Sequence, residues 1–551
     1  MPPQISKLTC LRTLSHLIVG EASCSGVKEL GPLFHLQGTL CISRLENVIE
    51  PRDAKDAKLI EKFGLDGLLL EWSDNLNESK DKTSELDILS MLHPGGTLKE
   101  LIIRRYGGVR FPSLLRYSSF PNMVLLRIEN CKKCTSLPPI GQLPSLKDLW
   151  IEGMDSMKNI DAEFYGKNCQ QTFRSLVTLY FKGMGGWENW ISYGEFPHLQ
   201  NLFIGDCPKL LGKLPNHLPL LEKVAEDLAT FKCKELAHLW TDDVGSLPQL
   251  PCLRVLKIEG CTKLASLVAE EVEEQLQLGM PSMVREIKIQ NCIVLESLPK
   301  AMMYNNTCLE YIQIVKCNSL LYFAKVQLPP TLKRLEIVHC KNMLVLLNGD
   351  NTSCSSSGSS SNNTSLLEYL YIENCPSLKS LTSSGELPYK NFEKFSKFWF
   401  LVAKTNENAI VKSWRQLQRE EELLTANLRL LQISSCEKMQ ALLNCIHRLT
   451  SLQELQIKAC PGILFFPEEG FPINLRSLVI SDLNITEALF EWGLHRLTSL
   501  SRLVISGGCQ HLTSFPEKKL PADSLTNLTI ERFPNLETLS SEGFRSLTSL
   551  E

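Results

Sequence analysis

The side chains that could do chemistry in this 551-residue chain are, above all, its 20 cysteines. Zinc sites need clustered ligands, such as two cysteines two residues apart with further ligands nearby. Cys131 and Cys134 have that spacing, but they fill the Cys and Leu positions of one repeated phrase. We therefore interpret the cysteines as reduced, buried thiols and expect neither a metal site nor a disulfide framework. The repeated Cys position is occupied by Cys131, Cys207, Cys261, Cys292, Cys317, Cys340, Cys375, Cys436, Cys460 and Cys509.

Catalytic signatures are absent from the sequence. It holds no G-x-x-x-x-G-K-[ST] phosphate loop, no H-E-x-x-H or G-x-S-x-G motif and no kinase signature set. The ten histidines are scattered, and His339 beside an expected strand is interpreted as a surface residue. We predict that the chain is not an enzyme and binds no cofactor.

One sequence phrase repeats along the chain, and the structure that it forms positions the repeated cysteines. Residues 332–346 read LKRLEIVHCKNMLVL, and the common form is L-x-x-L-x-I-x-x-C-x-x-L-x-x-L. Regular copies start 23 to 25 residues apart, for example at Leu309, Leu332, Leu452, Leu475 and Leu500. This is the leucine-rich-repeat phrase with Cys where many repeats have Asn, and about eighteen copies exclude chance.

The spacing predicts the fold. In L-x-x-L-x-I the second Leu and the Ile are two residues apart, so both point to one face of a short strand. One repeat cannot bury that face alone, whereas stacked repeats form a continuous core. We predict an α/β repeat solenoid: a leucine-rich-repeat horseshoe with a parallel sheet on its concave face and irregular or short helical segments on its convex side.

Changes in regularity suggest four segments. Residues 1–119 carry irregular repeats, and residues 120–388 carry regular Cys-type repeats with loops near 216–250 and 347–364. Residues 389–425 break the pattern, either as a functional insertion or as a gene-modelling error such as a retained intron. We favour the error because the repeat resumes intact at Leu428. Residues 426–551 hold the C-terminal repeats, which end without a capping unit.

The residue between the strand Leu and Ile of each repeat projects from the concave face. Trp150, Tyr180 and Phe203 fall on three consecutive strands and should form one exposed aromatic column. Exposed aromatic patches mark contact surfaces, so we predict protein-partner binding here, although a loop bearing Trp187 and Trp190 could instead fold over the column. The predicted contact residues are Arg127, Trp150, Tyr180, Phe203, Lys257 and Lys288.

Charge and hydropathy exclude several classes of protein. The 58 Lys and Arg against 61 Asp and Glu give a net charge of −3, which provides no basic field for nucleic acid. The longest aromatic-apolar run, Phe398–Ala403, is far shorter than a membrane span. The start, MPPQISKLTC, lacks the pattern of a secretory signal. We expect a soluble chain that is not exported.

Several phrases go beyond a generic repeat. Residues 36–48, LQGTLCISRLENV, are followed by Ala54, Ala57 and Lys62, then by LKELIIRRYGGVRFPSLL (98–115), LPPIGQLPSLK (137–147) and EFYG (163–166). In this order they resemble the leucine-rich-repeat region of plant disease-resistance proteins of the coiled-coil, nucleotide-binding type. The resemblance covers nearly the whole chain except about 389–425.

The resemblance implies an intracellular immune receptor, cytoplasmic or also nuclear. Its repeats would sense a pathogen effector or an effector-modified host protein, and would restrain the nucleotide-binding domain of the parent receptor. This sequence holds no coiled coil and no nucleotide-binding module, so it is expected to be a fragment or a truncated product. The alternatives are the substrate-recognition arm of a ubiquitin ligase, which would need an adaptor-binding box, or a truncated adaptor, decoy or relic. An extracellular receptor would need a signal peptide.

Overall fold

The computed structural model describes residues 4–20, 26–74, 82–112, 120–166, 172–191, 193–211, 218–221, 223–224, 233–236, 252–267, 283–298, 303, 306–324, 328–348, 365–382, 427–440, 446–463, 470–483, 489, 494–507, 510–515, 520–521, 523–539 and 547–551. The chain divides into two compact units, residues 1–284 and 285–551.

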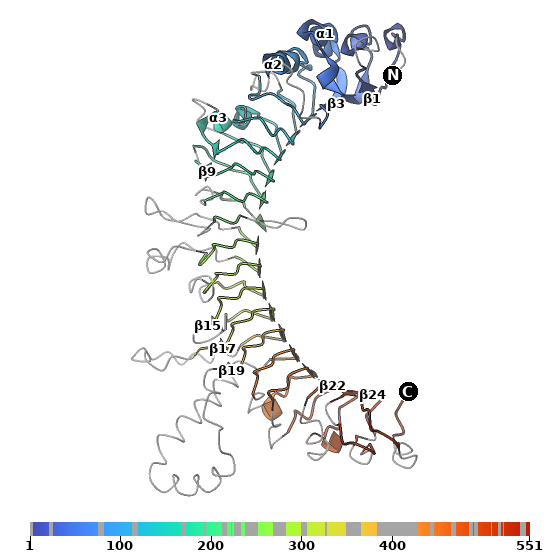
Figure 1. The fold of residues 1–551 in the computed structure, drawn as a ribbon, viewed down its shortest axis with the longest axis vertical. Coiled ribbons are helices and arrows are strands. Elements are labelled where there is room, and N and C mark those ends of the chain that lie inside the picture. The colour runs from blue at the N-terminus through green and yellow to red at the C-terminus, as the bar shows by residue number, and fades with distance from the viewer. Residues whose placement is uncertain are drawn as a thin grey trace, which may run out of the picture. The chain divides into compact units, whose positions relative to one another are not determined.

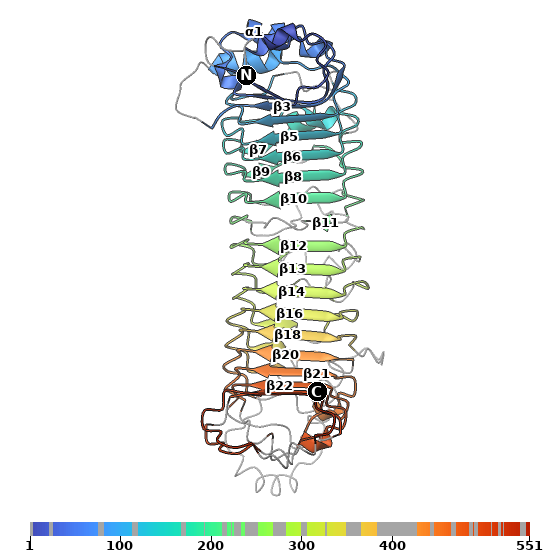
Figure 2. The same ribbon diagram turned by 90° about the vertical axis from the view of Figure 1, so that its right-hand side faces the viewer.

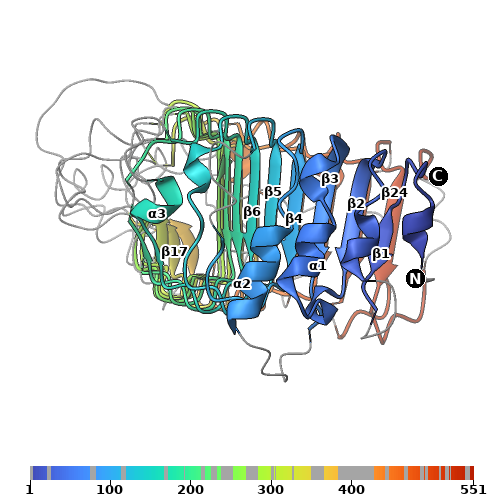
Figure 3. The ribbon, with the colours of Figure 1, turned by 90° about the horizontal axis from the view of Figure 1, so that it is seen from above.

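The first unit is built on a parallel sheet with one strand per repeat. Successive strands pair directly, and Figure 2 shows them as parallel rungs. Figure 3 shows β3 to β6 side by side. The strands are β1 (His16–Ile18), β2 (Gln37–Ser43), β3 (Gly64–Glu71), β4 (Glu100–Arg104), β5 (Leu125–Glu129), β6 (Asp148–Glu152), β8 (Thr178–Lys182), β10 (Asn201–Gly205), β11 (Lys223–Val224) and β12 (Val255–Glu259).

The second unit repeats this construction with a further run of parallel strands. They are β13 (Glu286–Gln290), β14 (Tyr311–Val315), β16 (Arg334–Val338), β18 (Tyr369–Glu373), β20 (Leu430–Ser434), β21 (Glu454–Lys458), β22 (Ser477–Ser481), β23 (Arg502–Ser506) and β24 (Asn527–Glu531). The predicted parallel sheet of a leucine-rich-repeat solenoid is therefore confirmed.

The core follows from the two-residue period of each strand. In β5, Leu126 and Ile128 are fully buried, while Leu125, Arg127 and Glu129 are half-buried and lie on the other side of the sheet. We call this other side the open face. The inward residues of neighbouring strands stack in register, so one repeat covers the apolar surface of the next.

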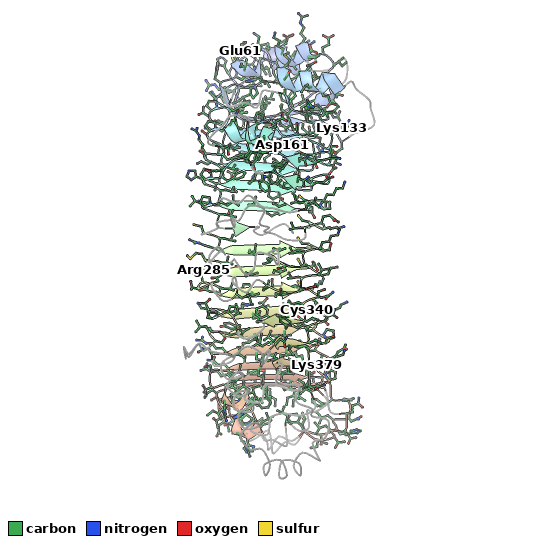
Figure 4. The ribbon with its side chains drawn as sticks, turned by 90° about the vertical axis from the view of Figure 1, so that its left-hand side faces the viewer. Glu61, Lys133, Asp161, Arg285, Cys340 and Lys379 are labelled. Atoms are coloured by element: carbon green, nitrogen blue, oxygen red, sulfur yellow. The ribbon has the colours of Figure 1, made fainter. Side chains whose placement is uncertain are left out.

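Short helices and small strands complete the side of the solenoid opposite the sheet, as predicted (Figure 1). Asp161, labelled on this side in Figure 4, accepts a hydrogen bond from the Glu163 amide and begins α3. The α-helices are α1 (Pro51–Asp56), α2 (Lys82–Met91) and α3 (Ala162–Tyr165). The 3₁₀ turns are η1 (Ile5–Lys7), η2 (Val27–Leu30), η3 (Leu45–Asn47), η4 (Leu59–Glu61), η5 (Ile140–Gln142), η8 (Ile446–Arg448) and η9 (Leu494–Arg496). The small strands are β7 (Asn159–Ile160), β9 (Asn189–Trp190), β15 (Tyr322–Ala324), β17 (Val345–Leu347) and β19 (Ser380–Thr382).

Most strands are followed by a residue with positive φ, which in the Cys-type repeats lies one position before the cysteine. Asn130, His339 and Asn374 adopt φ of 57°, 57° and 51°. The amide of His339 donates to the Glu373 carbonyl at 2.8 Å, which extends the ladder past the strand. Asparagine tolerates this left-handed conformation better than most residues. His339 thus turns the chain out of its strand, and its ring meets the Asn374 side chain at 2.7 Å.

The division between the two compact units falls at 284/285, which lies inside the predicted segment 120–388. The loop near 216–250 contains β11, and Leu218, Leu221 and Cys233 are fully buried, so a repeat is retained there.

The pattern break at 389–425 and most of the loop near 347–364 lie outside the described residues. β18 nevertheless pairs directly with β20, from Tyr369 opposite Leu430 to Glu373 opposite Ser434. The main sheet of the second unit therefore passes from residue 373 to residue 430 without an intervening strand.

Candidate functional site

The repeated cysteines form a buried structural series. Each described member is fully buried, and each thiol donates weakly to the carbonyl of the last strand residue, two positions earlier. The Sγ-to-oxygen distance is 3.6 Å from Cys131 to Glu129 and 3.4 Å from Cys436 to Ser434. Burial raises the pKa of Cys131 to about 12 and also raises the pKa of Cys317. At Cys131 and Cys317 the thiolate needed for nucleophilic chemistry is therefore disfavoured. Cys509 lies outside the described residues.

Alkylation of the native chain should therefore be selective. We expect iodoacetamide at neutral pH to label the exposed Cys10 readily. Cys131 should react about a thousandfold more slowly, because its raised pKa lowers the thiolate fraction and burial blocks access. Peptide mass spectrometry measures both rates, and urea-unfolded chain is the control in which the rates converge. Equal labelling of the two thiols in native chain would contradict the buried series.

Trp150, Tyr180 and Phe203 occupy equivalent positions on β6, β8 and β10, as the spacing predicted. The ring centroids of Trp150 and Tyr180 are 4.2 Å apart with an interplanar angle of 29°. Those of Tyr180 and Phe203 are 4.1 Å apart and nearly parallel, at 7°. The aromatic column, as we call these three residues, is a continuous stack on the open face.

The column is not equally exposed along its length. Trp150 and Tyr180 are half-buried, but Phe203 retains only 6% exposure. The expectation of a fully exposed column is therefore wrong at Phe203. Burial, with smaller contributions from Glu152 and Asp206, raises the pKa of Tyr180 to about 12, so its hydroxyl stays protonated at neutral pH.

The alternative that Trp187 and Trp190 cover the column is wrong. Both tryptophans pack behind the sheet against Phe181, the inward neighbour of Tyr180, at centroid distances of 5.0 and 5.5 Å. Trp187 is fully buried, and its Nε1 donates to the Asn189 carbonyl at 2.9 Å. The Trp190 Nε1 donates to the Tyr165 hydroxyl at 2.8 Å. They belong to the core, which leaves Trp150 and Tyr180 partly open to solvent.

Arg127 closes one end of the column. It lies directly opposite Trp150, and its guanidinium carbon is 4.8 Å from the centroid of that ring. Glu129 forms an ion pair with it: the Glu129 carboxylate is 3.3 Å from Nε of Arg127 and 2.5 Å from Nε of Arg104. A cation that is stacked on an aromatic face and paired with a carboxylate is suited to protein contact.

The row extends beyond the predicted residues. Ile102 pairs with Arg127 and Leu69 pairs with Ile102, and both are half-buried on the open face. The prediction began at Arg127 because the repeats before residue 120 are irregular in sequence. The spacing of Leu98, Leu101 and Ile103 would have located Ile102.

The structure does not join the predicted lysines to the column. Lys257 lies half-buried on β12, two strands beyond β10, and Lys288 lies in the second unit. The ammonium of Lys288 pairs with Glu286 and lies 5.2 Å from the Tyr311 ring centroid. Both lysines stay predicted contact residues.

The open face of the second unit is a polar network that sequence reasoning missed. Glu336, only 9% exposed, accepts hydrogen bonds from the Tyr311 hydroxyl at 2.9 Å, the Gln313 amide at 2.7 Å and the Arg334 guanidinium at 2.7 Å. These three donors are already hydrogen-bonded to Glu336 within the chain, so they are less available to a partner. The alternation that places Glu336 among outward residues was visible in the sequence, but its partners were not.

Within the described residues, no helix combines the length and apolar character needed to cross a membrane. The same residues hold no group of three or more His, Cys, Asp or Glu side chains arranged to bind a metal ion.

Comparison with known sequences places the chain among plant relatives. Residues 27–154 match the family model described as R13L1/DRL21 leucine-rich repeats. A putative disease resistance protein of Arabidopsis thaliana is 28% identical over 98% of this chain and 49% of its own length. The putative disease resistance RPP13-like protein 1 of the same plant is 34% identical over 51% of this chain and 30% of its own length.

The chain thus spans about half the length of the first relative and less of the second. Among solved structures, the Drosophila Toll–Spätzle complex matches 88% of this chain and 62% of that chain, with a TM-score of 0.40 and 11% identity. Residues 27–154 are thus similar to the R13L1/DRL21 leucine-rich repeats, and the chain as a whole is similar to the leucine-rich-repeat region of plant disease-resistance proteins.

Proposed function

We propose that this chain is the protein-recognition module of a plant intracellular immune receptor and acts without catalysis. The observation that carries the proposal is the aromatic column with Arg127, a stacked and partly exposed surface on the open face of a leucine-rich-repeat sheet. Aromatic and arginine side chains dominate binding hot spots in protein interfaces. The similarity to disease resistance proteins supports the immune role.

In this proposal the ligand is a pathogen effector or a host protein modified by one, and the chain works in the cytoplasm. In a parent receptor the repeats also restrain a nucleotide-binding domain, and ligand contact relieves that restraint. Such a switch requires the ligand to bind the two receptor states with different affinities. The cellular form is measurable: an antibody against residues 253–350 should detect a tissue protein much larger than a 551-residue chain.

The contact itself is tested by Trp150→Ala/Tyr180→Ala. The tagged chain is expressed in leaf tissue, and captured proteins are quantified by mass spectrometry. We expect at least one protein to be depleted about tenfold or more on the variant, because loss of two hot-spot rings removes most of the contact energy. The melting temperature should stay within a few degrees of wild type.

Gln432→Ala/Gln456→Ala is the matched control, because these residues occupy the same row on β20 and β21 of the second unit. The control should capture the same proteins as wild type. Identical capture by wild type and by the tryptophan–tyrosine variant would refute the aromatic column as the contact.

A further inference from the structure

The charges beside the aromatic column are not balanced on its two sides. Each strand of this region presents three outward positions, with the column residue in the middle. Glu100, Leu125 and Asp148 lie in register at the first outward position of β4, β5 and β6. We call these three residues the leading row.

On the other side of the column, the charged residues are paired. Arg104 contacts Glu129, which also pairs with Arg127 of the column row. Lys182 lies 3.7 Å from Glu152, and Arg105 lies 2.9 Å from both Glu71 and Asp74. Each charged residue of that edge therefore has an oppositely charged partner.

The carboxylates of the leading row are different. Among the described residues, no ion pair or side-chain hydrogen bond joins Glu100 or Asp148 to a partner. Glu100 is exposed and Asp148 is half-buried. They lie two strands apart, about 10 Å, with the apolar Leu125 between them.

We propose that the aromatic column and the leading row together bind a basic, amphipathic segment of a protein partner. Its apolar side chains contact Leu125, Ile102 and the exposed edges of Trp150 and Tyr180, and its Lys or Arg side chains pair with Glu100 and Asp148. Charge complementarity favours a basic segment, because an acidic one would meet two carboxylates that have no ion-pair partner among the described residues. The inference rests on the proposed recognition function and names the partner of the same surface.

The test uses short random peptides displayed on phage. Peptides are selected on the full wild-type chain after depletion on Trp150→Ala/Tyr180→Ala. We expect the retained peptides to be rich in aromatic and aliphatic residues. Their ratio of Lys and Arg to Asp and Glu should exceed that of the starting library by about threefold or more.

Glu100→Gln/Asp148→Asn should lower the affinity of the chain for the retained peptides about tenfold. It should also reduce the dependence of peptide binding on salt. Glu437→Gln/Glu454→Gln in the second unit removes the same number of charges and should leave binding unchanged. Peptides that need Trp150 but are neutral or acidic would overturn the basic-partner inference while leaving the recognition function intact. Failure to retain any peptide that depends on the column would overturn both.

Discussion

Replacing Trp187 with Ala should lower the free energy of unfolding by about 3–5 kcal/mol, whereas Trp150→Ala should lower it by only about 1 kcal/mol. Trp187 is fully buried and packs against Phe181 and Trp190, so truncation leaves a cavity behind the sheet. Trp150 is half-buried on the open face and loses mainly its stacking on Tyr180. Urea unfolding followed by circular dichroism measures both changes.

Trp187→Phe is the matched control, since it keeps a ring in the core and removes mainly the hydrogen bond to the Asn189 carbonyl. Trp187→Phe should lower the free energy of unfolding by about 1 kcal/mol. A loss for Trp150→Ala as large as that for Trp187→Ala would mean that the column is part of the core, and the recognition surface would have to be sought elsewhere.

The second large effect concerns Lys62, whose side chain is 1% exposed. Its ammonium donates to the carbonyls of Leu30 at 2.7 Å and Leu33 at 3.1 Å and lies 5.5 Å from the Phe34 ring centroid. Burial lowers the pKa of Lys62 to about 8. Above that pH the folded chain releases a proton that the unfolded chain still holds, up to its pKa near 10.5. Folding stability from this group therefore rises with pH across that window.

Relative to Lys62→Met, the wild-type chain should gain about 2 kcal/mol of unfolding free energy between about pH 7.5 and about pH 9.5. Urea titrations of both proteins at several pH values measure the difference. Because the two proteins share all other titratable groups, including the tyrosines, the contributions of those groups to the unfolding free energy cancel in the difference. A difference that stays flat, or that falls as pH rises, would show that Lys62 keeps an ordinary pKa in the folded chain.

The strand positions and their register were predictable because they depend on a local pattern. Alternation with a period of two residues decides which side of the sheet a residue faces. The spacing of successive phrases decides which residues lie opposite one another. Arg127, Trp150, Tyr180 and Phe203 could therefore be placed in one row from the sequence, and the structure pairs them in that order.

What each residue touches was decided by contacts between repeats. Trp187 belongs to the core because Phe181 and Trp190 pack around it, although its sequence position suggested a loop. Lys62 reaches carbonyls about 30 residues earlier in the chain, a distance over which no spacing rule operates. The repeat, the parallel sheet and the face on which each strand residue lies follow from the sequence pattern, because they are local properties of the chain. Which aromatic rings are buried and which carboxylates have no ion-pair partner depends on atoms from neighbouring repeats, so packing had to reveal them.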